Sequence, residues 1–292
     1  MSYPFQRNYI QTIKFVKAIW EKILAVIESR KEKETYQNLL KTDSLIKAQK
    51  LNTKSIPVLI INYNQLFYLE QLIDFLTERN FSNIIILDNK STYPPLLQYY
   101  EKIKDQIKIE YLAENYGHKV LYEAPGLLEK YCQGYYFLTD SDIVPNERLP
   151  DNFADVMLQK LELYFSKVSK IGFALRIDNI PDHFKLKDKV LSWEKLFWIN
   201  PVEKNGYLTT IDTTFALYKP QYGLKFTNIE FLKGLRLAGD YSATHGGWYL
   251  NTENLSEENK FYFATVNKSA SWALDKDGKS LAGYEIKENR NY

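Results

Sequence analysis

A change in hydrophobic pattern at residues 56–64, which read IPVLIINYN, sets the fold class of this 292-residue chain. Ile56 to Ile61 form a short, uninterrupted apolar run, which is typical of a strand buried on both faces of a sheet. The run stops at Asn62, Tyr63 and Asn64. Such a strand needs helices packed on both of its sides, so the segment predicts an α/β fold.

The alternation of apolar strands and amphipathic helices continues to residue 140. Further strands are expected at 83–87, 107–112 and 135–138. Between the strands, apolar residues recur every three or four positions, which indicates helices at 66–80, 94–103 and 119–132. This order predicts a mainly parallel sheet flanked by helices and joined by right-handed crossovers.

Polar clusters follow the ends of the four expected strands. They are residues 62–64, 88–92, 115–118 and 140–142. The carboxyl ends of parallel strands meet at one edge of a sheet, where α/β proteins bind their ligands. Four clusters in these positions predict a shared binding site.

Asp140, Ser141 and Asp142 directly follow the fourth strand. Two carboxylates at positions i and i+2 of a strand-ending turn can both reach one divalent ion. Mg²⁺ and Mn²⁺ are hard ions that accept carboxylate and phosphate oxygens together. The pair favours a metal–diphosphate site, and the alternative is a solvated turn or helix cap.

The amino-acid composition limits which kinds of metal site and binding partner are possible. One cysteine, Cys132, and three histidines exclude a multi-cysteine metal site, so a metal site must be built mostly from carboxylates. Basic residues exceed acidic ones by 38 − 36, a net charge of +2, which argues against a nucleic-acid binder that relies on bulk charge. The single cysteine favours a reducing compartment, and neither a signal peptide nor a spanning apolar run is evident, so a cytoplasmic location is expected.

Together these motifs resemble those of a GT-A type (Rossmann-like) glycosyltransferase, and the N-terminal half is most similar to family-2 enzymes. The resemblance covers residues 56–150 and is carried by segments 60–64, 88–92, 115–117 and 139–142. It implies transfer of a sugar from a nucleotide-diphosphate sugar, a UDP-sugar in the first place, with Mn²⁺ or Mg²⁺.

The same resemblance implies that Asn62, Tyr63 and Asp88 hold the nucleobase and ribose. Asp88 would accept a base N–H and Tyr63 would stack on the base; for Asp88 the alternative is a turn-forming residue. Many relatives have Asp-Gly-Ser where this chain continues with Asn89-Lys90-Ser91.

Residues 115–119 are expected to lie next to the nucleotide. Asn115 and Gly117 suggest a tight turn, after which Lys119 could contact a phosphate and His118 the ribose or donor sugar. The alternative is that both are solvated loop residues.

The second half is expected to bind the acceptor. Residues 207–218 alternate like one long strand, with Asp212 among apolar neighbours. A carboxylate there is costly unless it is hydrogen-bonded or functional, so Asp212 is the first candidate for the catalytic residue. It would deprotonate the acceptor hydroxyl or stabilise the donor sugar. The rival acids are Asp178, Glu194 and Asp240.

His245 precedes Gly246, Gly247 and Trp248. Several GT-A families use a late histidine near Gly and Trp as a further metal ligand, and His245 resembles it. The resemblance groups His245 with Asp140 and Asp142; the alternative is a structural loop histidine. The two glycines could also let backbone amides approach a phosphate.

Residues 9–28 have the spacing of an amphipathic helix that contains Trp20. Such a basic helix can lie on an anionic membrane surface, and the alternative is that it packs on the rest of the protein or on another subunit. The expected domains are a helical extension over 1–54, a nucleotide-sugar half over 55–150, and an acceptor half with the C-terminal segment over 151–292.

The sequence thus predicts a metal-dependent glycosyltransferase, in the first place a hexosyltransferase, with a saccharide, lipid-linked or other hydroxyl acceptor. Composition rich in Lys, Asn, Ile and Tyr is a faint hint of bacterial surface polysaccharide or glycoconjugate synthesis. A nucleotidyltransferase is disfavoured because no Gly-rich loop follows the first strand. The other alternative is a non-catalytic saccharide-binding or scaffold module, against which the aspartate pair argues.

Overall fold

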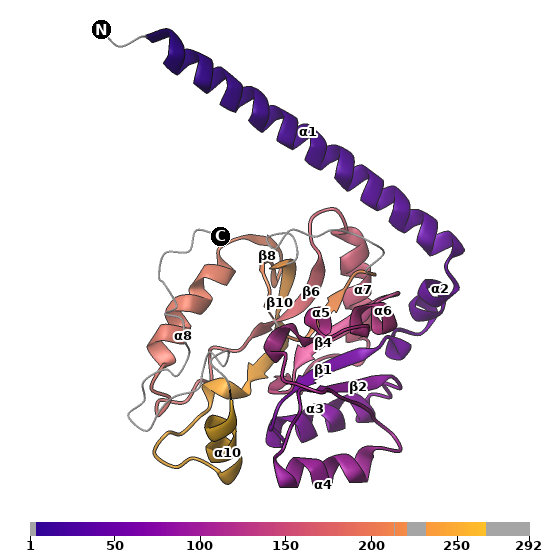
Figure 1. Ribbon diagram of the computed structural model, residues 1–292, viewed down its shortest axis with the longest axis vertical. Coiled ribbons are helices and arrows are strands. Elements are labelled where there is room, and N and C mark those ends of the chain that lie inside the picture. Colours follow the sequence, from indigo (N-terminus) through magenta and orange to yellow (C-terminus); the bar gives the residue numbers. More distant parts are fainter. Residues whose placement is uncertain (1–3, 213, 221–231, 267–292) are drawn as a thin grey trace. The chain divides into compact units, whose positions relative to one another are not determined.

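The computed structural model describes residues 4–212, 214–220 and 232–266 (Figure 1). The chain divides into two compact units, Met1–Lys47 and Ala48–Tyr292. Residues 267–292 of the expected C-terminal half lie outside the described residues.

Two helices begin the chain. Helix α1 spans Pro4–Thr42 and α2 spans Ser44–Leu51. The helix expected over 9–28 is therefore part of a longer one, because the Lys, Arg and Glu residues that follow it are good helix formers. Asp43 precedes α2, and its Oδ1 accepts a hydrogen bond from the Ile46 N–H at 3.0 Å. Within the described residues, none of the helices is both long and apolar enough to cross a bilayer.

One ten-stranded sheet forms the centre of the larger unit, in the order β3-β2-β1-β4-β9-β6-β10-β8-β7, with β5 paired to β10. Strands β1 to β4 run parallel, and β9 is inserted antiparallel between β4 and β6. The strands are β1 Val58–Asn62, β2 Ile84–Asp88, β3 Lys108–Tyr111, β4 Tyr136–Asp140, β5 Ile143–Pro145, β6 Lys170–Leu175, β7 Pro201–Glu203, β8 Gly206–Thr210, β9 Ala216–Tyr218 and β10 Lys233–His245.

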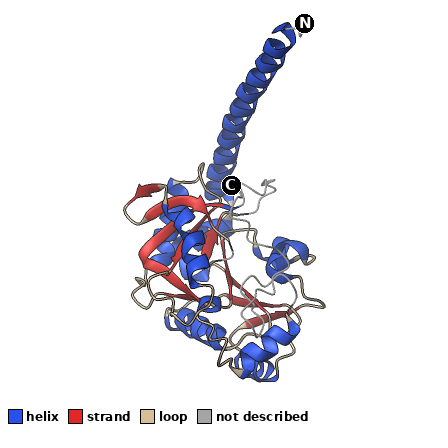
Figure 2. Cartoon of the chain, turned by 90° about the vertical axis from the view of Figure 1, so that its left-hand side faces the viewer, coloured by secondary structure: helices blue, strands red, loops and turns tan. Residues whose placement is uncertain are grey.

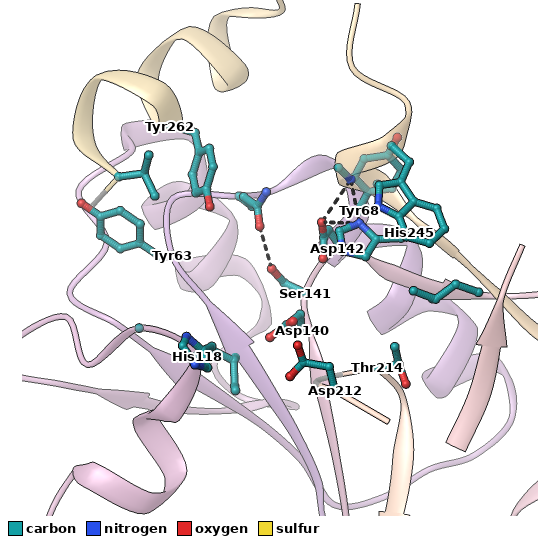
Figure 3. A pocket seen from close by; sticks show the side chains of 18 of the residues that line it. Tyr63, Tyr68, His118, Asp140, Ser141, Asp142, Asp212, Thr214, His245 and Tyr262 are labelled. Atoms are coloured by element: carbon teal, nitrogen blue, oxygen red, sulfur yellow. Dashed lines mark hydrogen bonds and ion pairs between the residues drawn. The ribbon is translucent and has the colours of Figure 1, made fainter. Parts of the chain in front are cut away.

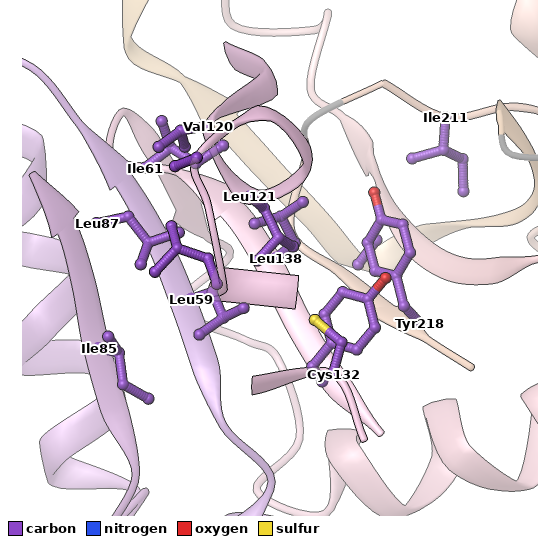
Figure 4. Packing of buried hydrophobic residues seen from close by; sticks show 14 residues of the cluster. Leu59, Ile61, Ile85, Leu87, Val120, Leu121, Cys132, Leu138, Ile211 and Tyr218 are labelled. Atoms are coloured by element: carbon purple, nitrogen blue, oxygen red, sulfur yellow. The ribbon is translucent and has the colours of Figure 1, made fainter. Parts of the chain in front are cut away.

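Helices pack on both faces of the parallel strands, as the red strands between blue helices in Figure 2 show. On one face, side chains of β1, β2 and β4 pack against Val120 and Leu121 of α5 (Figure 4). On the other face, the ring of Phe137 lies 6.1 Å from that of Phe81 and 6.4 Å from that of Phe153 in α7. Neighbouring strand residues point to opposite faces, so strands between two helical layers must be apolar throughout. The helices are α3 Phe67–Glu78, α4 Pro94–Ile103, α5 Val120–Glu123, α6 Leu127–Tyr131, α7 Phe153–Leu163, α8 Lys187–Glu194 and α10 Glu257–Thr265. The expected fold class, a mainly parallel sheet flanked by helices with an N-terminal helical extension, is confirmed.

The expectation of one long strand over 207–218 is wrong. The segment forms two strands, β8 and β9, which pair with different partners in the sheet. Ile211 lies between them against the sheet, where a Cβ on Gly234 would come within 2.5 Å of its Cδ1 and a Cβ on Gly172 within 3.2 Å. The two glycines thus make room for the chain to cross from β8 to β9, which moves Asp212 off a strand and onto the crossing.

Candidate active site

A cavity of about 360 Å³ opens at the carboxyl ends of the parallel strands (Figure 3). The four polar clusters expected to share a site all contribute to its wall, although not with every residue. The sequence-predicted site residues among its lining are Tyr63, Asn115, Gly117, His118, Asp140, Asp142, Asp212 and His245. Three other predicted residues, Asn62, Asp88 and Lys119, are not among the lining residues.

The acids of the cavity come from two parts of the chain. Asp140 ends β4, and the following Ser141 is fixed by hydrogen bonds from its N–H to the Ile61 carbonyl (3.0 Å) and from its hydroxyl to Gln65 Oε1 (3.3 Å). Asp212 lines the same cavity from the β8–β9 crossing, and Figure 3 shows its side chain in the same part of the cavity as Asp140. Asp212 is exposed, so the expectation of a buried carboxylate among apolar neighbours is not met.

Asp142 and His245 form a second group in the cavity wall. The Nδ1 of His245 lies 3.4 Å from Asp142 Oδ2, and the N–H of Gly247 donates to both, at 3.1 Å and 3.2 Å respectively. The His245 ring also stacks on Trp248, with centroids 5.0 Å apart. The backbone of the glycine segment therefore fixes both side chains, and the structure brings together the two residues that the sequence paired.

Gly246 has a packing role in the same wall. A Cβ at Gly246 would lie 2.3 Å from the ring of Tyr68, so only glycine lets that ring approach. Burial, together with the nearby charge of Asp142, raises the pKa of the Tyr68 phenol to about 12. Tyr68 therefore remains a neutral hydrogen-bonding group at the cavity.

The loop after β3 is held in place by Asn89, a residue that the sequence reasoning did not single out. Its side chain donates to the Gly117 carbonyl (3.1 Å) and accepts from the Tyr116 N–H (3.1 Å). Gly117 has φ +65°, and its N–H donates to Asn115 Oδ1 at 2.8 Å, which makes the predicted tight turn. The turn presents His118 to the cavity, while Lys119 lies 3.8 Å from Glu123 in an exposed pair.

Asn62 and Asp88 are directed into the protein. Both are about 1% exposed, and both bond to the hydroxyl of Tyr100: Asn62 Nδ2 donates to it at 2.8 Å, and it donates to Asp88 Oδ1 at 3.0 Å. Asp88 Oδ2 also accepts from the Ser91 N–H, the turn contact that was the alternative for this residue. Burial and the charge of Asp88 raise the pKa of the Tyr100 phenol well above its usual value.

Helix α10 lines the cavity next to Tyr63. The hydroxyl of Tyr63 donates to the Thr265 carbonyl (2.9 Å), and its ring lies 6.4 Å from that of Tyr262. Glu258 accepts hydrogen bonds from the Phe67 N–H at the first turn of α3, where the helix dipole favours a carboxylate. Tyr262 and α10 were absent from the sequence reasoning because no local pattern links residues so far apart.

The part of the chain after residue 150 contributes Glu194 and Arg236 to the lining. Both side chains are buried, and the Arg236 guanidinium donates to Glu194 Oε2 at 2.5 Å. Of the other rival acids, Asp178 pairs with Arg176 (3.0 Å) and Asp240 lies 3.4 Å from Arg148, and neither is among the lining residues. Of the four acids considered in the second half, Asp212 and Glu194 therefore line the cavity, and Glu258 of α10 is a further acid in its wall.

The oxygen donors of the cavity suit a hard divalent cation. Asp140, Asp142 and Asp212 all line it, and Mg²⁺ typically takes one or two carboxylates and completes its shell with water and substrate phosphate. Within the described residues, no three His, Cys, Asp or Glu side chains are grouped as a metal site by themselves. A cation here would rely on two protein carboxylates and on ligand oxygens.

Comparison with known proteins gives structural neighbours alone. No family model matches the sequence, and no curated protein matches it. The mannosyltransferase PcManGT from Pyrobaculum calidifontis, solved with GDP-Man and Mn²⁺, has a TM-score of 0.42 and 13% identity over 82% of this chain and 70% of that one. TarS of S. aureus, residues 1–349, has a TM-score of 0.39 and 14% identity over 75% of this chain and 70% of that one. A complex of the same TarS segment with UDP has a TM-score of 0.39 and 13% identity, over 70% of this chain and 62% of that one. Because these scores are low, the roles given to residues below rest on the site itself. PcManGT is a mannosyltransferase, and mannosyltransferases are glycosyltransferases, the class of enzyme that the sequence resembles.

Proposed function

We propose that this protein is a metal-dependent glycosyltransferase that uses a nucleotide-diphosphate sugar. One observation carries the proposal: Asp140 and Asp142, at the end of a parallel strand, share a cavity with Asp212 from the far half of the sheet. Three carboxylates in one cavity suit a polyanionic ligand only when a cation is present with it. This combination is expected for a diphosphate donor.

Asp140 and Asp142 are proposed to hold Mn²⁺ or Mg²⁺. The cation, when bound, neutralises the charge that develops on the leaving diphosphate. The resemblance made His245 a third metal ligand, but no three such side chains are grouped as a metal site within the described residues. His245 is proposed instead to orient the Asp142 carboxylate, with which it shares the Gly247 N–H. His118 and the Asn115–Gly117 turn are placed to contact the ribose or the donor sugar.

Asp212 is proposed to act at the sugar. In an inverting reaction its carboxylate accepts the proton of the acceptor hydroxyl, and in a retaining one it stabilises the donor sugar. Glu194 is less suited to either role because Arg236 already occupies its carboxylate. The acceptor is proposed to be a saccharide or lipid-linked hydroxyl, and the donor a UDP-sugar carrying a hexose.

A donor screen followed by site variants tests the proposal. A matching nucleotide sugar should raise the melting temperature with Mn²⁺ and not without it, because binding to the folded state stabilises it by mass action. Asp140→Asn and Asp142→Asn should each lower turnover or donor hydrolysis by about a hundredfold or more, equivalent to about 3 kcal/mol. Asp212→Asn should lower transfer while the Mn²⁺-dependent shift remains.

Asp178→Asn is the matched control, since Asp178 is an exposed aspartate of the same half that pairs with Arg176 and lies outside the cavity. It should retain wild-type turnover. Normal turnover in Asp142→Asn would contradict the proposal. The proposal would also be contradicted if every nucleotide sugar that binds does so without Mn²⁺. Release of pyrophosphate from a nucleoside triphosphate and a sugar phosphate would replace it with nucleotidyl transfer.

A further inference from the structure

Helix α1 carries exposed apolar side chains along one stretch of its length, residues 15–27. We call the aromatic and branched aliphatic side chains of residues 15–27 the apolar face of α1. They are large and exposed, from 41% for Ile19 to 67% for Phe15, with Trp20 at 59%. Exposed apolar groups in such a concentration usually mark an interaction surface.

The width of the apolar face distinguishes between kinds of partner. At 3.6 residues per turn, Phe15 and Leu24 fall on opposite borders of the face, so it covers about half of the helix circumference. A coiled-coil seam needs two positions in seven, a much narrower stripe. A face of this width suits a flat apolar medium into which one side of a helix sinks.

The charges on α1 are arranged for a negative surface. Residues 14–27 contain Lys14, Lys17 and Lys22 against Glu21, a net charge of 3 − 1, or +2. At the same helical period, Lys17 falls beside Leu24 at one border of the apolar face, and Lys22 falls beside Phe15 at the other. Lysines at the borders can extend their ammonium groups to phosphates while their methylene stems stay in apolar surroundings.

We propose that α1 lies on the surface of an anionic lipid bilayer, with its apolar face buried among the acyl chains and Lys17 and Lys22 at the headgroups. The apolar face is about 20 Å long at ~1.5 Å per residue, which gives room for binding in the plane of the interface. Anionic lipid adds attraction for each lysine near the surface. The inference does not depend on the proposed sugar transfer.

Sedimentation of the full-length protein with vesicles tests the proposal. Vesicles of phosphatidylcholine with phosphatidylglycerol should retain the protein, and vesicles of phosphatidylcholine alone should retain much less. The paired substitution Lys17→Glu and Lys22→Glu should weaken binding at least about tenfold, since each border lysine contributes to the attraction. High salt should weaken it in the same direction.

A matched pair of neutral substitutions separates the apolar face from the rest of the helix. Ile23→Gln, in the middle of the apolar face, should weaken vesicle binding, whereas Ala18→Gln, on the polar side of α1, should leave it unchanged. Far-UV circular dichroism shows that the helix is retained in both variants. Equal retention of Ile23→Gln and Ala18→Gln, or failure of the wild type to sediment with anionic vesicles, would overturn the proposal.

Light scattering, which measures the oligomeric state, tests the alternative that a second copy of the chain covers the apolar face. A stable dimer that Ile23→Gln dissociates, together with an absence of vesicle binding, would assign the apolar face to a second copy of the chain. If the protein binds vesicles but transfers no sugar in solution, only the proposed function is contradicted. The two proposals can therefore fail separately.

Discussion

Two sets of acidic side chains line the same cavity and differ in how far they are buried. Glu194 of α8 is buried and paired with the guanidinium of Arg236 at 2.5 Å. Asp140 and Asp212 are contributed by distant segments and line the cavity, with Asp212 exposed (Figure 3). The first acid is neutralised inside the fold, whereas the second set consists of carboxylates that face the cavity.

The difference separates a structural role from a functional one. Burial raises the pKa of Glu194 and lowers that of Arg236, and the attraction between the two charges opposes both shifts. A buried pair of this kind is costly to break because the remaining charge has no compensation. Carboxylates that are not fully buried, such as those of Asp140 and Asp212, can reach a ligand in the cavity, which is why they are the better candidates for holding one.

The largest effect is expected from breaking the buried pair. Arg236→Met should lower the free energy of unfolding by about 3–5 kcal/mol, because Glu194 is left buried without its cation. Urea denaturation measures the loss. The double variant with Glu194→Gln should regain most of it, and a loss that the second substitution does not reduce would show that the pair is not the cause.

A pH dependence is expected from Lys170 of β6, whose charge interacts with that of Asp212. Its buried Nζ donates to the Tyr218 hydroxyl at 3.0 Å, and burial, against the opposing charge of Asp212, lowers its pKa to about 7. Between this value and about 10.4, the unfolded chain binds the extra proton, so wild-type stability gains from Lys170 as the pH rises.

Lys170→Met removes that dependence. The advantage of the Met variant over the wild type in unfolding free energy should shrink by about 1.4 kcal/mol per pH unit from pH 7 toward pH 9.5. Comparing the two chains cancels the titration of the tyrosines, which also changes in this range. A constant difference across these pH values would mean that Lys170 is not neutralised on folding.

The smallest effect is expected from Asp212→Asn. Because Asp212 is exposed, the substitution should change the unfolding free energy by less than about 1 kcal/mol, measured by urea denaturation at pH 8. The same substitution is expected to lower sugar transfer. A destabilisation as large as that of Arg236→Met would place Asp212 in the structural class with Glu194.

Local pattern was sufficient for the parallel half of the sheet. The apolar run at 56–61 and its repeats predicted β1, β2 and β4, because strands covered by helices on both faces must be apolar at every position. The edge strand β3 followed from the alternation of residues 107–112. The local pattern was not sufficient to predict β8 and β9 as separate strands, since alternation over 207–218 fits one strand as well as two. The crossing between them depends on Gly172 and Gly234, which are distant in sequence from Ile211.

The cavity shows the same division. Residues at strand ends, such as Asp140, could be placed from sequence because parallel strands end at a common edge. The direction of a side chain at that edge could not. Asp88 is the last residue of β2, at the expected edge, yet it is turned inward onto the Tyr100 hydroxyl, a partner provided by helix packing.

The sequence by itself determined the alternation of strands and helices and the edge at which the polar residues gather, because these follow from hydrophobic period and strand direction. The tertiary structure decided which acids meet. Asp212 lines the same cavity as Asp140 because two glycines admit Ile211 against the sheet, and Glu194 is neutralised because β10 brings Arg236 within hydrogen-bond distance of it. Contacts of this kind depend on steric fit between segments far apart in the chain, for which local sequence carries no signal.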